Sequence, residues 1–170
     1  MPDKKIHDAL NEHITLELHA WYAYTGMSLW FEIHDLPGMA SFMKQQADEE
    51  MAHANRIIQH LLDRDVHPVL PTIKPASVEY ESVKSIFESM LAAEQKVTAS
   101  IENCYRIAEQ EDDQPARLML EWFIGEQVEE EALARSIIGR INLAGDTGPG
   151  LLLVDQELGK REPHAHENEA

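Results

Sequence analysis

Apolar residues recur at alternating steps of three and four positions in four long segments of the chain. Such spacing places them along one face of an α-helix, so each segment is predicted to be an amphipathic helix. Proline and glycine interrupt the pattern near residues 35–38, 65–80, 111–115 and 145–150. Each uninterrupted segment has roughly 25 to 30 residues, which corresponds to about 40 Å of helix. The pattern therefore predicts four long helices around a common core.

The links between these segments predict how the helices are arranged. The first and third links are short and favour antiparallel neighbours, whereas residues 65–80 are long and proline-rich and can run the length of a bundle. After the stretch GDTGPG, the segment LLLVDQELGK predicts a brief fifth helix. We expect an all-α four-helix bundle with a long crossover between the second and third helices, plus a short fifth C-terminal helix. This domain is expected over residues 1–160, followed by a polar mobile tail, 161–170.

Composition narrows the partners and the compartment. The chain has 170 residues, with 31 acidic and 14 basic residues and a formal charge of −17, which argues against nucleic acid or an anionic membrane as partner. The single cysteine excludes an intrachain disulfide framework, and the start MPDKKIHDAL lacks the apolar core of a signal peptide. The longest uncharged apolar-rich run, residues 20–31, is too short to span a bilayer. We therefore expect a cytoplasmic protein whose natural partners are cations.

A glutamate interrupts the middle of each apolar stripe, and these four are Glu17, Glu50, Glu94 and Glu130. The fourth stripe also passes through Glu126 and Leu133. Any one of these glutamates alone would be interpreted as a surface residue. A buried carboxylate is costly unless it is paired or binds a metal, so four inward positions together predict a metal site.

The neighbours of these glutamates indicate which metal is bound. His53 follows Glu50 at i+3, and Glu130 follows Gln127 at i+3, so each pair projects from one helical face. Di-iron bundles carry one glutamate on each of two helices and Glu-x-x-His on the other two. The fourth segment departs from that rule, because Gln127 and Glu130 stand where a Glu-x-x-His would be, which leaves His53 as the single imidazole of the set. Oxygen-rich donors suit iron, and no cysteine stands among the candidate ligands to suggest structural zinc or an iron–sulfur cluster. We predict a loose di-metal site that exchanges ions.

Five stretches carry a resemblance to a known family. The chain resembles the bacterial non-haem ferritins over nearly its whole length, through NEHITLELHAWYAY, ADEEMAHANRII, LAAEQKVTASI, EWFIGEQVEEEALARSII and LAGDTGPGLLLVDQEL. The resemblance implies a ferritin-like bundle with a di-iron ferroxidase centre. One iron would be held by Glu17, Glu50 and His53, and the second by Glu50, Glu94 and Glu130. Gln127 and Tyr24 match family positions beside this centre.

The resemblance also implies a third iron site and a function. The third site would use Glu49, Glu126 and Glu129 and share Glu130. The implied activity is oxidation of Fe(II) by dioxygen or hydrogen peroxide, with Fe(III) mineral stored inside a hollow homo-oligomeric shell, expected to have 24 subunits. The acidic turn formed by Glu109, Glu111, Asp112 and Asp113 resembles the rim of a channel through which iron passes.

Three alternatives stay open. A haem-containing bacterioferritin is suggested by Met51, which matches its axial ligand position, but Gln127 with Glu130 departs from the Glu-x-x-His pair of that family, so haem is not expected. A di-iron oxidase acting on another substrate can share the same fold. A structural or DNA-protecting shell fits poorly with the charge of −17. No partner spacing assigns a role to the histidines at positions 7, 13, 19, 34, 60 and 67.

Overall fold

A computed structural model describes residues 4–161, which form five α-helices and contain no strand. The predicted tail lies outside the described residues beyond Arg161. The prediction of four long helices and a short fifth is confirmed, and the helices are α1 (Lys4–Ile33), α2 (Pro37–Leu62), α3 (Val83–Gln110), α4 (Gln114–Ala144) and α5 (Pro149–Leu158).

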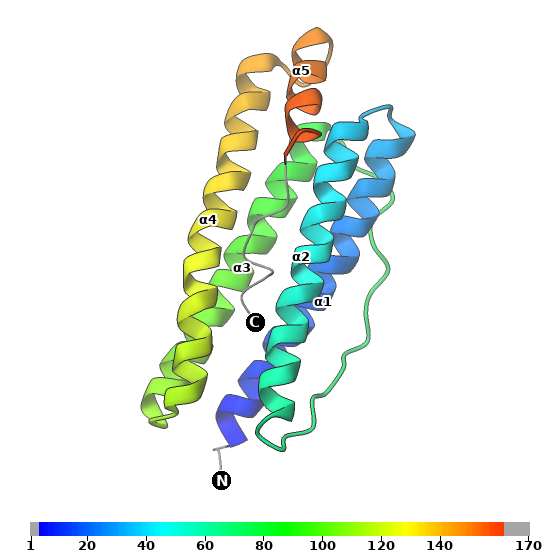
Figure 1. Cartoon of the computed structure of the whole chain (residues 1–170). Coiled ribbons are helices and arrows are strands. Elements are labelled where there is room, and N and C mark those ends of the chain that lie inside the picture. Colours follow the sequence, from blue (N-terminus) through cyan, green and yellow to red (C-terminus); the bar gives the residue numbers. More distant parts are fainter. Residues whose placement is uncertain (1–3, 162–170) are drawn as a thin grey trace.

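The crossover between α2 and α3 sets the topology (Figure 1). Residues 63–82 run back along the bundle, so that α2 and α3 point the same way, whereas α1–α2 and α3–α4 are antiparallel pairs joined by short turns. The short helix α5 packs on α2 and α4 at one end of the bundle. None of the helices in the described residues is long and apolar enough to cross a membrane.

Local signals start and stop the helices. Ser82 caps α3 through a capping box with Ser85, and prolines stand in the first turns of α2, α4 and α5. Asp113 caps α4 by accepting a hydrogen bond from the Ala116 amide at 3.1 Å. Asp113 also pairs with both terminal nitrogens of Arg64, at 3.0 and 2.7 Å, and is buried. Asp113 therefore ties the turn that follows α2 to the start of α4, and its place at a channel rim stays a prediction.

Helix α5 is attached to the start of α2 through a buried carboxylate. The Met39 amide donates to Asp155 Oδ1 at 2.8 Å, which satisfies one of the free amides at the start of α2. Gly38 lets the two backbones meet, since a Cβ at this position would lie 1.8 Å from the Asp155 carbonyl oxygen. The packing of α5 therefore depends on the absence of a side chain at residue 38.

The buried apolar side chains form two clusters rather than one core. One cluster lies towards α5 and includes Phe31, Phe42 and Phe87, and the other includes Leu10 and Phe123. On α2, α3 and α4, buried polar residues fall between the two clusters. We call six buried polar side chains the polar layer, and they are Glu17, Glu50, His53, Glu94, Gln127 and Glu130. Glu49 on α2 is also buried between the clusters and stands beside this layer.

At two positions, the buried face of α4 is shifted by one residue along the chain from the predicted stripe. Gln127 and Ala134 are buried, whereas Glu126 and Leu133, which the stripe placed inward, are half-buried. Positions three and four residues from Glu130 both lie near its face, so periodicity alone cannot choose between them. The choice follows from packing against α3, because the Gln127 Nε2 donates to the Glu94 backbone carbonyl at 3.2 Å.

We expect Gly38→Ala to lower the melting temperature of the protein and to loosen α5, because the new methyl group would overlap the Asp155 backbone. Gly139→Ala is the matched control, since a Cβ there meets nothing within 4 Å and alanine favours the helix by about 0.5–1 kcal/mol. Thermal unfolding followed by circular dichroism tests both. Equal melting temperatures for the two variants would contradict this account of α5.

Candidate metal centre

The polar layer brings together side chains from all four long helices. Glu17 lies on α1, Glu50 and His53 on α2, Glu94 on α3, and the predicted pair of α4 completes it. All of these side chains are buried, and Glu17 and Glu94 are fully so. The sequence prediction that these polar positions face inward therefore agrees with the observed burial.

Three of the predicted ligands form a compact group. Among the described residues, Glu17, Glu50 and His53 are the group whose ligand atoms all lie within 4.8 Å of one another. The His53 Nδ1 lies 3.5 Å from Glu50 Oε2 and 3.8 Å from Glu17 Oε2, too far for good hydrogen bonds. All three atoms are buried without a hydrogen-bond partner. Buried polar atoms are normally satisfied, and a cation between these three would satisfy them together.

The remaining carboxylates lie beside this group and are held differently. The Tyr24 hydroxyl donates to Glu94 Oε1, and the Gln127 Nε2 donates to Glu94 Oε2 at 3.1 Å. Both oxygens of Glu94 are thus hydrogen-bonded, whereas Glu130 Oε2 is buried without a partner. The structure therefore brings Tyr24 and Gln127 into contact with the centre through Glu94.

Burial and neighbouring charges shift the pKa values of the side chains in the polar layer. Burial and the charges of Glu94 and Glu17 raise the pKa of Glu50 well above its usual value. Burial together with Glu94 and Glu49 raises the pKa of Glu130 to about 8. Burial would lower the pKa of His53, but the adjacent carboxylates of Glu17 and Glu50 raise it well above its usual value. The layer therefore favours bound protons or cations over free carboxylates.

Glu17 behaves differently because of a histidine that the sequence patterns left without a role. Burial would raise the pKa of Glu17, but the charge and hydrogen bond of His13 outweigh burial, and the pKa is lowered. The His13 Nε2 lies 2.7 Å from Glu17 Oε1, and its Nδ1 lies 2.9 Å from Ser100 Oγ. His13 stands four residues before Glu17, and this helical spacing was the signal that could have identified it.

The residues predicted for a third iron site are less tightly grouped. Glu49 is buried and accepts a hydrogen bond from Gln46, while Glu126 is half-buried and Glu129 is exposed. The charge of Glu49 acts on the pKa of Glu130, which brings these two carboxylates into one electrostatic neighbourhood. Of the four predicted ligands, Glu49 and Glu130 therefore lie near each other in the structure. The third iron site stays a prediction.

Three other residues near the centre have different surroundings. The Trp122 ring meets the His53 ring edge to face at 5.6 Å and carries the Arg56 guanidinium at 4.0 Å on its face. Met51 is partly buried and packs against the apolar cluster that contains Leu10. Asp48, next to Glu49 on α2, is exposed.

Comparison with known proteins identifies the family. The sequence profile of the ferritin-like domain matches residues 7–144, which include all of α2, α3 and α4 and most of α1. The chain belongs to the ferritin family. The bacterial non-heme ferritin of Escherichia coli O157:H7 is 36% identical over 151 residues, covering 89% of this chain and 92% of that relative. That of Staphylococcus saprophyticus is 36% identical over 161 residues, covering 95% and 96%.

Solved structures agree with this membership. An open pore ferritin from the archaeon Archaeoglobus fulgidus superposes on this ferritin with a TM-score of 0.91 at 32% identity, covering 94% of this chain and 98% of that one. A structure described as a humanized archaeal ferritin gives the same TM-score at 34% identity, covering 94% and 97%. The predicted ferritin-like fold with its short fifth helix is therefore confirmed.

The raised pKa of Glu130 predicts proton release on metal binding. In the metal-free protein Glu130 holds its proton below about pH 8, so binding of Fe(II) to its carboxylate would release that proton. Above this pH the carboxylate is already free and no proton is released from it. Anaerobic calorimetry with Fe(II), in buffers of different ionisation enthalpy, measures the release.

We expect wild type to release more protons than Glu130→Gln at about pH 6.5, and the difference to disappear near pH 9. Glu121→Gln is the matched control, because it changes an exposed glutamate on the same helix. Equal release by wild type and Glu130→Gln at every pH would contradict the prediction.

Proposed function

We propose that this ferritin oxidises Fe(II) at a di-iron ferroxidase centre and stores the Fe(III) product for iron storage and detoxification. The observation that carries this proposal is the group formed by Glu17, Glu50 and His53, whose facing atoms are buried and lack hydrogen-bond partners. Membership of the ferritin family and relatives named bacterial non-heme ferritin support it.

In this proposal each side chain has a stated role. Glu17 and His53 bind the first iron, Glu94 and Glu130 bind the second, and Glu50 bridges the two. Gln127 and Tyr24 hold Glu94 through the hydrogen bonds described above. Carboxylate oxygens favour Fe(III) over Fe(II), because a higher charge gains more from anionic ligands.

Placing two Fe(II) ions side by side matches the electron demand of the oxidant. Each iron gives one electron, and dioxygen takes up both electrons with two protons as hydrogen peroxide. With hydrogen peroxide as oxidant, two electrons and two protons give two waters. Delivery in pairs avoids one-electron reduction to superoxide. Ferric iron then hydrolyses and leaves the centre as mineral.

Storage requires an enclosed space, which a single bundle does not provide. We propose that residues 1–160 form one ferritin-like di-iron domain that assembles into a hollow homo-oligomer of 24 subunits in the cytoplasm. Large apolar side chains stand exposed on the single chain, and such surface supports association. They include Leu29, Ile33, Leu118 and Leu143, which are 61%, 80%, 70% and 91% exposed.

We expect Glu50→Ala and His53→Ala to slow the initial oxidation of Fe(II) by about 10–100-fold, because each removes a ligand of the proposed centre. Asp48→Ala is the matched control, since it removes an exposed carboxylate from the same helix. Stopped-flow absorbance of Fe(III) after oxygen is mixed with anaerobically loaded protein gives the rate. If both ligand variants oxidise and retain iron at the wild-type rate, the proposed centre is wrong.

The third iron site has a separate test. Glu129→Ala should leave the first fast oxidation intact and change later turnover or the amount of oxygen consumed per iron. An oxygen electrode and repeated additions of Fe(II) measure both quantities. Glu121→Ala, another exposed glutamate on α4, should behave as wild type. Identical behaviour of Glu129→Ala and wild type would remove the third site from the proposal.

A further inference from the structure

The centre contains one buried side chain that the proposed function does not use. His13 on α1 is fully buried, and both of its ring nitrogens are engaged, by Glu17 on the same helix and by Ser100 on α3. The ring also lies edge to face with Phe123 at 6.1 Å between centroids. Contacts with α1, α3 and α4 fix the orientation of the His13 ring. The ring can therefore hold the Glu17 carboxylate in one position.

We propose that His13, oriented by Ser100, is a positioning residue that occupies Glu17 Oε1 and presents Oε2 alone to iron. This inference rests on the proposed function, since it concerns how the first iron is bound.

The hydrogen bonds of His13 exclude it as a ligand. The carboxylate of Glu17 can only accept, so the His13 Nε2 carries the hydrogen and donates it at 2.7 Å. The other nitrogen is committed to the Ser100 hydroxyl at 2.9 Å. Neither nitrogen therefore has a lone pair free for a metal. His13 acts on iron only through Glu17.

The two oxygens of Glu17 differ as this role requires. Oε1 is held by His13, whereas Oε2 is buried without a hydrogen-bond partner and faces His53 Nδ1 at 3.8 Å. A carboxylate that binds through one oxygen fills one coordination position instead of two. The first iron would thereby keep a position for water or the oxidant. Glu94 has no such asymmetry, because Tyr24 and Gln127 engage both of its oxygens.

The test compares two replacements of His13 with one of Ser100. His13→Leu keeps an apolar side chain in the buried site but removes the donor, whereas His13→Gln offers an amide N–H in its place. Ser100→Ala removes the hydroxyl that orients the imidazole of His13 but leaves the imidazole itself in place. His19→Leu is the matched control, because His19 also lies on α1 but contacts the crossover, with its Nε2 3.3 Å from the Thr72 carbonyl.

Two readouts separate positioning from simple stability. Anaerobic titration with Fe(II) measures affinity, and the visible absorption of Co(II) bound in place of iron reports the coordination number. We expect His13→Leu to weaken the first Fe(II) by about 10–100-fold and to change the Co(II) spectrum towards higher coordination. His13→Gln should restore both readouts, and Ser100→Ala should change the spectrum in the same direction as His13→Leu.

The outcomes distinguish this inference from the proposed function. The role of His13 is overturned if both His13→Leu and Ser100→Ala keep the wild-type affinity and spectrum. If Glu50→Ala loses Fe(II) binding in the same experiment, the proposed function still stands. Retained binding and oxidation in Glu50→Ala would overturn the function itself. A metal–nitrogen bond to His13, seen by X-ray absorption as one nitrogen ligand lost in His13→Gln, would also overturn the positioning role. If His13→Leu fails to fold, the Ser100→Ala spectrum alone decides.

Discussion

Mutual repulsion among buried carboxylates is the constraint on which the rest of this structure depends. Glu17, Glu50, Glu94 and Glu130 lie together in the polar layer, away from water that would screen them. Each charge left uncompensated there is costly, and the raised pKa of three of them expresses that cost. Bound cations remove the repulsion. The same arrangement therefore favours a bound cation in the layer.

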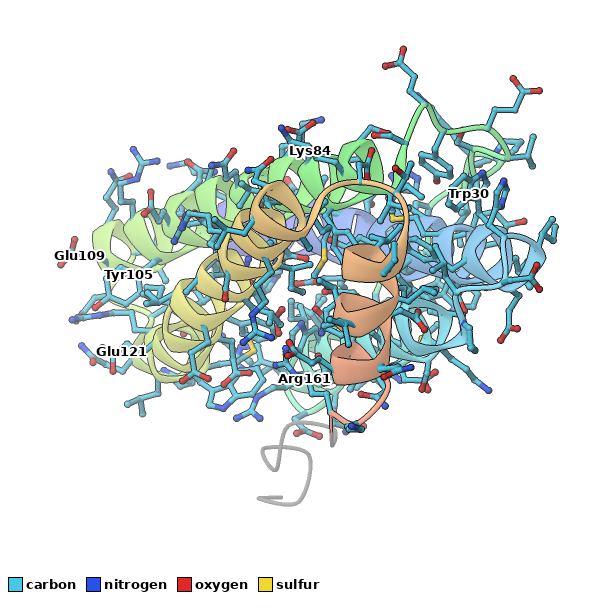
Figure 2. All side chains as sticks on the ribbon, turned by 90° about the horizontal axis from the view of Figure 1, so that it is seen from above. Trp30, Lys84, Tyr105, Glu109, Glu121 and Arg161 are labelled. Atoms are coloured by element: carbon cyan, nitrogen blue, oxygen red, sulfur yellow. The ribbon has the colours of Figure 1, made fainter. Side chains whose placement is uncertain are left out.

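The bundle tolerates this layer because apolar packing surrounds it on both sides. One cluster lies towards α5 and the other towards the opposite end, so each helix is held above and below its polar residues. The attachment of α5 to α2 through Asp155 and the pairing of Arg64 with Asp113 fix the two ends. Arg161 lies just beyond the end of α5 (Figure 2). Its charge acts to lower the pKa of Glu130.

The two halves of the centre are supported in different ways. On one side His13 holds a single oxygen of Glu17, and on the other Tyr24 and Gln127 hold both oxygens of Glu94. These supporting contacts join α1 to α3 and α3 to α4. A difference between the two proposed iron positions is thus present in the protein before any metal binds.

The sequence by itself determined the helices, their order and the inward glutamates, because helical periodicity and turn residues are local properties. It also identified Glu50 with His53, whose spacing along one helix guarantees proximity. Tertiary structure decided which of two neighbouring positions on a helix faces the core, because helical periodicity allows either. It turned Gln127 inward instead of Glu126, and it joined His13 to Ser100, 87 residues away. Those contacts depend on how separate helices rotate against one another, and side-chain packing across the bundle sets that rotation.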